Sequence, residues 1–237
     1  MDSQAERHRL ESIAQHSLYA HGASGLSVRH SYSIVERFLR DGSILELGAA
    51  EGVMTNYLAR RGQPLTIVEG SGRFCADLRA RFPQCEVVHA LFEEFEPGRA
   101  FDNIVLGHVL EHVDDPVRIL ARVRSWLSER GRVVASVPNA RSLHRQAAVS
   151  LGLLQFEEEL NDLDRHHGHR RVYNPETFRR DFRAAGFTVE TFGGYWIKPL
   201  SNQQLDSTWT DEMIQAFMQL GERYPDIAAE IYVVART

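Results

Sequence analysis

Two histidines and a glutamate lie within five residues, in His108-Val109-Leu110-Glu111-His112. The order H-x-x-E-H also occurs in inverted zinc peptidases, where it lies on a helix so that side chains four residues apart share one face. Here the segment follows the apolar run 101–107 and precedes Asp115-Pro116, a pair typical of a helix start. We therefore predict a loop at the end of a strand, and we exclude a peptidase site.

A loop at the carboxyl end of a strand borders the ligand crevice of an open α/β sheet. An imidazole has an ordinary pKa near 6.5, so His112 can act there as a general base toward a hydroxyl or ammonium group. Glu111 and His112 can alternatively serve only to hydrogen-bond the loop.

The densest polar stretch of the chain is 162–173, directly before the predicted helix start Asn174-Pro175-Glu176. Its three histidines and two aspartates could hold zinc, although zinc sites more often include cysteines. Arg165, Arg170 and Arg171 could recognise an anionic group such as a phosphate, a carboxylate or a nucleotide-linked sugar. A solvated basic face is the alternative.

Asn139 and His144 follow a predicted strand and could face the ligand of the same crevice. The apolar-leaning run 147–156 comes next, and it is predicted either to cover the ligand as a lid or to pack as an amphipathic helix. Three glutamates at 157–159 argue against a membrane-surface role for this run.

The segment Ile44–Gly52 is an apolar strand that runs into a turn of small residues and then a helix. Small residues let a ligand touch the backbone, and a helix N-terminus offers free N–H groups. Glu46 and the small residues at 48, 50 and 52 read E-x-G-x-A-x-G, which differs from the dinucleotide fingerprint G-x-G-x-x-G. Glu69 ends the next strand, where a carboxylate can accept both hydroxyls of a ribose. Together they predict a nucleoside-type ligand, and a tight turn beside a solvated strand end is the alternative.

The elements that position these motifs alternate between strands and helices. The predicted strands are Ser43–Gly48, Pro64–Glu69, Glu86–His89, Phe101–Gly107, Arg132–Val137, Phe187–Phe192 and Glu230–Ala235. The predicted helices cover 52–61, 71–81, 115–128 and 211–223, with two more in 5–40 broken at 21–25. This order predicts an α/β fold whose mostly parallel sheet is covered by helices on both faces.

One domain is expected for 237 residues. We divide it into an N-terminal helical cap (1–42), a cofactor-binding core (43–137), a lid insertion (138–171) and the C-terminal part of the sheet (172–237) with its own insertion (197–228). A formal charge of −5 and a pI near 6.1 give no global basic field, so nucleic acid is not an expected partner.

The chain has no apolar run of the ~20 residues that cross a bilayer, and its first nine residues are polar, unlike a secretory signal. Its two cysteines, Cys75 and Cys85, are expected to be reduced. We expect a cytoplasmic protein that acts on a small molecule and not at a membrane.

These motifs together resemble those of class I S-adenosylmethionine-dependent methyltransferases, especially the branch of ubiquinone-pathway O-methyltransferases and natural-product or sugar methyltransferases. Besides the loop 46–52 and Glu69, the resemblance rests on Phe101-Asp102-Asn103-Ile104-Val105, on 108–116 and on Gly131-Arg132-Val133-Val134 after Leu127. It spans roughly 43–192. It implies a Rossmann-like, seven-stranded, mostly parallel sheet and a transfer of the methyl group of S-adenosylmethionine to a small, anionic or sugar-type metabolite.

The resemblance also implies roles for individual residues. The cofactor would be held by Glu46, Gly48, Ala49, Ala50, Gly52, Glu69, Gly70, Leu91, Phe92 and His108. His112 and His169 would be catalytic, and Asn139, His144, His167, Arg170 and Tyr173 would bind the acceptor. Many relatives carry an aspartate just before the adenine-flanking pair, where this chain has Val88-His89-Ala90. In the ubiquinone-pathway relatives a divalent metal is held at the positions of His108, Glu111 and His112, but this chain has histidine where they have the first glutamate.

The expected reaction is an in-line displacement in which an oxygen, preferred over a nitrogen, attacks the sulfonium methyl group and S-adenosylhomocysteine leaves. Two other functions remain open. A nicotinamide-dependent oxidoreductase would share the sheet and the acidic strand end, but it would need the other glycine spacing. A non-catalytic protein could bind S-adenosylmethionine as a sensor or partner subunit.

Overall fold

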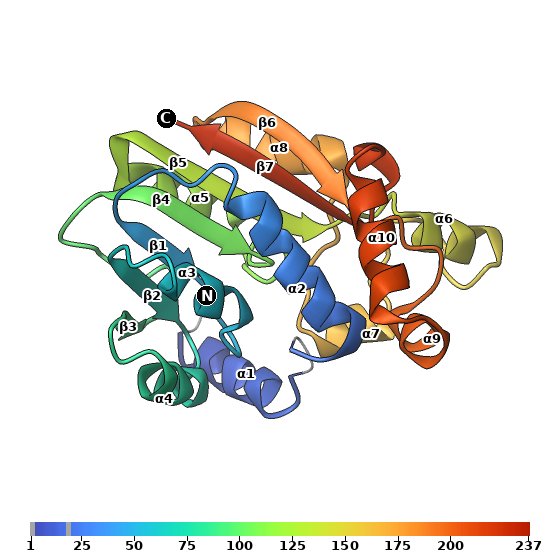
Figure 1. The fold of residues 1–237 in the computed structure, drawn as a ribbon, viewed down its shortest axis with the longest axis horizontal. Helices are drawn as coiled ribbons and strands as arrows, with labels where there is room; N and C mark the ends of the chain where they lie inside the picture. The colour runs from blue at the N-terminus through green and yellow to red at the C-terminus, as the bar shows by residue number, and fades with distance from the viewer. Residues whose placement is uncertain (1–2, 18–19) are drawn as a thin grey trace.

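Seven strands form the central sheet of the computed structural model, which describes residues 3–17 and 20–237 (Figure 1). They are β1 (Ile44–Leu47), β2 (Leu65–Glu69), β3 (Glu86–His89), β4 (Phe101–Gly107), β5 (Leu127–Pro138), β6 (Thr188–Tyr195) and β7 (Glu230–Arg236). Their order is β3-β2-β1-β4-β5-β7-β6, and β7 alone runs in the direction opposite to the other six strands. The predicted α/β fold with a mostly parallel sheet is confirmed.

Helices cover both faces of the sheet because its strands are apolar on both sides. Ile104 and Val133 face the layer of α5 (Pro116–Trp126) and α8 (Pro175–Ala184). Their neighbours Val105 and Val134 face the opposite layer. That layer is made of α2 (Gly22–Val35), α3 (Val53–Ala59) and α4 (Gly72–Arg81). Figure 1 shows α2 across the front of the sheet, with α5 and α8 behind it.

Polar caps start two of these helices where the sequence predicts them. The Asp115 side chain accepts a hydrogen bond from Arg118 N at 2.9 Å, and proline occupies the first helical turn of α5. Asn174 forms a capping box with Thr177 at the start of α8. Both helices therefore begin directly after a polar loop that lies at the carboxyl edge of the sheet.

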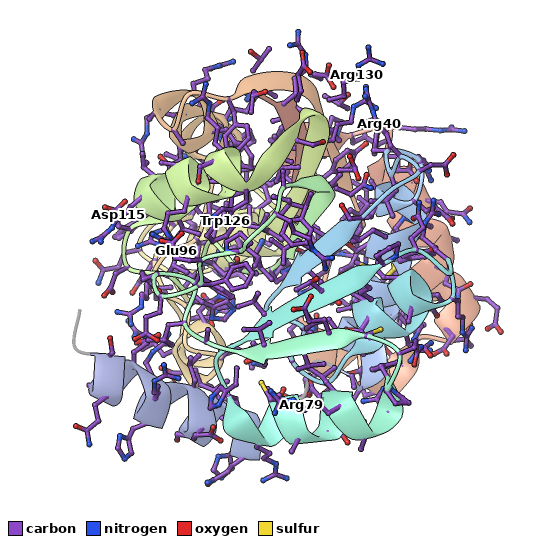
Figure 2. The ribbon with its side chains drawn as sticks, turned by 90° about the vertical axis from the view of Figure 1, so that its left-hand side faces the viewer. Arg40, Arg79, Glu96, Asp115, Trp126 and Arg130 are labelled. Atoms are coloured by element: carbon purple, nitrogen blue, oxygen red, sulfur yellow. The ribbon has the colours of Figure 1, made fainter. Side chains whose placement is uncertain are left out.

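The N-terminal helices differ from the expectation in where they are interrupted. Helix α1 (Ser3–Gln15) lies beside α4, as Figure 2 shows, while α2 already begins at Gly22. The predicted break at 21–25 is therefore wrong. His21 is the N-cap with extended backbone, and Gly25 N donates to His21 O at 3.0 Å, so the glycines lie in the first turn of α2. The interruption falls between 15 and 22, and residues 18–19 within it lie outside the described residues.

The two insertions carry short helices. Residues 138–171 include α6 (Leu143–Ser150) and α7 (Asp162–His166), and 197–228 include α9 (Asn202–Thr208), α10 (Asp211–Gly221) and the short 3-10 helix η1 (Pro225–Ile227). Leu151, Leu153 and Phe156 are 74%, 73% and 54% exposed, while Leu154 is buried, and a position of this run over a bound ligand stays a prediction. Among the described residues, no helix has both the length and the apolar character that a membrane span needs.

Candidate active site

One cavity of about 280 Å³ opens at the edge where the parallel strands end, under α1 and α2. We call its side nearest β1 and β2 the cofactor half, lined by Glu46–Glu51, Glu69–Ser71 and Ala90–Glu93. We call the other side the acceptor half, lined by His108, His112, Asn139, His144, Arg145, Asp164, His167, His169, Lys198 and Glu230. The cavity thus joins the two groups of residues that the sequence separates.

The loop after β1 lets a ligand approach the backbone. Gly48 has φ +71°, and a Cβ there would lie 3.0 Å from Val109 Cγ2, another lining residue. Ala50 also has a positive φ, of 45°. Gly52 is not among the residues that line the cavity, although its neighbours Glu51 and Val53 are. A Cβ at Gly52 would lie 2.8 Å from Leu78 of α4, so this glycine allows α3 and α4 to pack closely, and its contact with the cofactor stays a prediction.

The two carboxylates of the cofactor half are held by hydrogen bonds. Glu69 accepts from Ala50 N at 3.0 Å and from Ser71 N at 2.9 Å, and burial raises its pKa. Glu46 accepts from the Thr55 hydroxyl at 2.7 Å, and burial raises the pKa of Glu46 to about 7. Glu69 thereby ties the glycine loop to the end of β2, and its carboxylate faces the cavity in a fixed orientation.

Apolar side chains complete the cofactor half. Leu91 and Phe92 line it, as does Gly70, over which Leu10 of α1 packs so closely that a Cβ would lie 2.4 Å from Leu10 Cδ1. His89 Nε2 lies 3.0 Å from Gly70 O. Helix α1 is therefore part of the wall of the cavity.

His108 joins two buried carboxylates. Its backbone has φ +57°, and its Nδ1 lies 3.2 Å from Glu111 Oε1 while its Nε2 lies 3.7 Å from Glu230 Oε2. Burial opposes the charge of the imidazolium, but the attraction of Glu230 and Glu111 outweighs it and raises the pKa of His108 to about 9. His108 is thus positively charged at neutral pH, between Glu111 and Glu230.

Glu111, His112 and His169 bring potential metal-binding atoms within 4.8 Å of one another. This set fits a divalent metal in the kind of donors it offers, one carboxylate and two imidazoles. It differs from the expected trio, because His169 takes the place of His108. The segment 108–112 lies on a loop between β4 and α5, as the sequence predicts.

The rings of His112 and His169 meet edge to face, with centroids 4.8 Å apart. His112 Nδ1 lies 3.3 Å from Gly168 O, and burial lowers the pKa of His112 to about 4. His169 Nδ1 lies 3.2 Å from Asp164 Oδ1. His112 is therefore neutral at pH 7, with a buried carboxylate beside it to stabilise a proton that it takes up.

The lid contributes a buried ion pair. Arg145 donates to Asp164 Oδ2 at 3.0 Å and to Glu157 O at 2.8 Å. Burial opposes the charge of Asp164, yet the contacts with His169 and Arg145 lower the pKa of Asp164 to about 2. This pair fixes α6 against α7, so the histidines of the lid are held at the cavity by the fold.

The predicted acceptor residues Asn139, His144 and His167 line the cavity, but the fold uses their polar atoms to different extents. Asn139 donates to Asp226 O at 3.0 Å and Ala228 O at 2.8 Å, so its amide nitrogen is used by the fold. His144 Nδ1 is buried without a hydrogen bond among the described residues, and burial strongly lowers the pKa of His144. Burial also lowers the pKa of His167, to about 4.

Arg170 and Tyr173 do not line the cavity, which corrects their predicted roles. Arg170 pairs with Glu6 and Asp114 and donates to His112 O at 2.8 Å. Tyr173 is 2% exposed and donates its hydroxyl to Asp181 at 3.1 Å.

Arg171 likewise does not line the cavity, where it was expected to bind an anion. It donates to the carbonyl oxygens of Leu110, Val113 and Asp114, the last at 2.9 Å. Arg170 and Arg171, which were expected to recognise an anion, therefore stabilise the loop after β4, whereas the third arginine, Arg165, is exposed and pairs with Asp162. Backbone carbonyls compete for Arg170 and Arg171 because the lid lies directly against that loop.

Lys198 and Glu230 line the acceptor half and were missed by the sequence analysis. Lys198 follows β6, and Glu230 begins β7. A signal for Lys198 was present, since it is the single lysine among 27 lysines and arginines. Trp196, two residues earlier, has φ +72°, and all three non-glycine residues with positive φ in the described ranges line this cavity.

Three comparisons with known proteins bear on this site. A family model described as "Methyltransferase domain" matches residues 26–191. The ubiquinone biosynthesis O-methyltransferase of Aeromonas salmonicida (strain A449) is 26% identical over 168 residues, which are 68% of each chain.

Two solved structures share the fold. An S-adenosylmethionine-dependent methyltransferase from Mesorhizobium loti superposes with a TM-score of 0.65 at 20% identity, over 90% of this chain and 100% of that one. A Thermotoga maritima protein described as a possible histamine N-methyltransferase superposes with a TM-score of 0.63 at 16% identity, over 98% and 95% of the two chains. The relatives thus include both oxygen and nitrogen methylation in their descriptions.

Proposed function

Because this chain belongs to the family of methyltransferase domains, we propose that it transfers a methyl group to an oxygen of a small acceptor bound beside His112. Its cofactor is S-adenosylmethionine. The observation that carries the proposal is that the glycine loop and the histidines line the same cavity. Donor and acceptor can therefore meet in line.

The cofactor half suits a nucleoside with a charged amino-acid tail. Gly48 leaves space for the ligand at the loop, and the Glu69 carboxylate can accept hydrogen bonds from ribose hydroxyls. Leu91 and Phe92 offer apolar contacts to a base. The bound cofactor supplies an electrophilic methyl group, so the protein needs only to align the acceptor and remove its proton.

His112 is the proposed base. It is neutral at pH 7 and lies in the acceptor half. The neighbouring Glu111 carboxylate stabilises the imidazolium that forms when His112 takes the proton. His169 stands edge-on to His112 and would orient its ring. If Glu111, His112 and His169 hold a divalent metal instead, the metal would supply a Lewis acid that lowers the pKa of the acceptor hydroxyl.

Oxygen is preferred as the nucleophile because the Aeromonas salmonicida relative, whose similarity covers 68% of this chain, is described as an O-methyltransferase. The test is transfer of label from methyl-labelled S-adenosylmethionine into separate pools of sugar nucleotides, phenols and amines. We expect label in a hydroxyl-bearing pool, and His112→Asn should reduce kcat by about 10²-fold or more. His166→Asn, which changes an exposed histidine outside the cavity, is the matched control.

Four outcomes would count against parts of this proposal. Label in the amine pool alone would overturn oxygen as the nucleophile. Full activity of the His112 variant would overturn the base. S-Adenosylhomocysteine binding without transfer into any pool would favour the non-catalytic alternative, while activity that is lost in EDTA and restored by a divalent cation would assign the histidine and glutamate cluster to a metal.

A further inference from the structure

Lys198 is the single lysine of the chain, and it lies in the acceptor half of the cavity. The other 26 basic residues of the lysine and arginine type are arginines. The Lys198 ammonium lies 4.8 Å from the centre of the Trp196 ring. Among the described residues, no carboxylate oxygen lies within 4.0 Å of this ammonium, and no side chain accepts a hydrogen bond from it.

The other cations that line the cavity are already engaged by the fold. Arg9 pairs with Glu6, and Arg145 pairs with Asp164 at 3.0 Å. His108 lies between its two carboxylates. Lys198 therefore presents the cationic group in this cavity that an incoming ligand can contact without breaking an ion pair in the described structure.

Backbone hydrogen bonds hold the segment that carries Lys198 in place. Trp196 has the strained φ of +72°, and its carbonyl accepts from Ala229 N at 2.7 Å while its N–H donates to Met218 O at 3.0 Å. The carbonyl of Lys198 itself accepts from His144 N at 3.2 Å. Strained backbone persists where the surroundings enforce it, and such positions cluster at functional sites. Hydrogen bonds to α10, to the residue before β7 and to α6 thus fix the backbone that carries Lys198.

We infer that Lys198 anchors an anionic group of the methyl acceptor, a carboxylate or a phosphate, in the acceptor half. The inference rests on the proposed function, and it names the acceptor class and the residue that selects it. It also moves anion recognition from Arg170 and Arg171, whose guanidinium groups contact the loop after β4, to a residue that comes after β6.

The electrostatic surroundings agree with this role. Burial lowers the pKa of Lys198 to about 8, against the opposing attraction of Glu230, Asp164 and Asp206, while Arg145 adds to the lowering. The ammonium is still largely protonated at pH 7. A desolvated cation gains more from a ligand anion than an exposed one, because the local dielectric constant is lower.

A single lysine also makes the test direct. Protein labelled with [¹³C]lysine and saturated with S-adenosylhomocysteine has one lysine side-chain signal to follow. We would titrate it with benzoate, phenyl phosphate and the neutral benzamide. We expect benzoate or phenyl phosphate, but not benzamide, to shift this signal, and the tighter of the two identifies the anion as carboxylate or phosphate.

Calorimetry on variants supplies the second measurement. Lys198→Met and Lys198→Gln should weaken binding of the anionic probe about tenfold or more. Arg141→Gln removes one positive charge from the lid outside the cavity, where Arg141 pairs with Glu176, and should change it less than about twofold. Binding of S-adenosylhomocysteine should be unchanged in all three, which also reports that they are folded.

The inference is overturned if benzamide binds as tightly as the anions, if no anion shifts the lysine signal, or if the Lys198 variants keep the affinity for the anion. These results leave the proposed function standing as long as S-adenosylhomocysteine binds. Failure of the unaltered protein to bind S-adenosylhomocysteine would overturn the proposed function itself.

Discussion

Gly48 and Gly62 provide a matched pair for testing the cofactor half. Both have a left-handed backbone, with φ +71° and +70°. A Cβ at Gly48 would enter the cavity and lie 3.0 Å from Val109 Cγ2 and 3.5 Å from Phe92 Cζ, whereas a Cβ at Gly62 would meet nothing within 4 Å. The substitutions Gly48→Ala and Gly62→Ala therefore share the backbone strain and differ in the added contact.

The size of each effect follows from these geometries. Alanine in the left-handed region costs about 1–2 kcal/mol relative to glycine. For a chain of this length each kcal/mol lowers Tm by roughly 2–4 °C, so both variants should melt about 2–8 °C lower. Gly48→Ala should additionally lose affinity for S-adenosylhomocysteine by about tenfold or more, which is about 1.4 kcal/mol, because the methyl group occupies space that the ligand needs.

The assay is calorimetric titration with S-adenosylhomocysteine, together with thermal unfolding of each variant without ligand. Gly62→Ala should bind with unaltered affinity despite its lower Tm. The reasoning is refuted if Gly48→Ala binds as tightly as Gly62→Ala, since the loop after β1 would then not be in contact with the cofactor.

Three further predictions concern stability and pH. Thr55→Val removes the 2.7 Å hydrogen bond to buried Glu46, so we expect a loss of about 1–3 kcal/mol in denaturant unfolding and a further rise in the Glu46 pKa; an unchanged unfolding midpoint would contradict this. The folded-state pKa of His108 is raised to about 9 from 6.5, so the stability from its ion pairs is complete below pH 6.5 and is lost as the pH rises through 9. His108→Gln should flatten the stability curve over that window, and an unaltered slope would refute the ion-pair assignment. Tyr173→Phe should cost about 1 kcal/mol through its bond to Asp181 and leave kcat unchanged, and a fall in kcat at equal stability would return Tyr173 to the site.

Local patterns in the sequence account for the sheet and for the cofactor half. Buried parallel strands require apolar residues on both faces. The glycine loop follows β1 and Glu69 ends β2, and these two strands are consecutive in the sequence and adjacent in the sheet. Helix starts at Asp115 and Asn174 are equally local, because an N-cap bonds its own first turn. These features were therefore predictable from residue types and spacing alone.

Tertiary structure alone decided which polar side chains of the acceptor half remain available to a ligand. Arg170 and Arg171 lie in the polar stretch before α8 and Lys198 follows β6, and their sequence contexts do not show which of these cations the fold engages. The fold places a carbonyl and two carboxylates within reach of Arg170 and three carbonyls within reach of Arg171, but among the described residues no carboxylate oxygen lies within 4.0 Å of the Lys198 ammonium. Such competition depends on distances between segments more than fifty residues apart, which short-range periodicity does not encode.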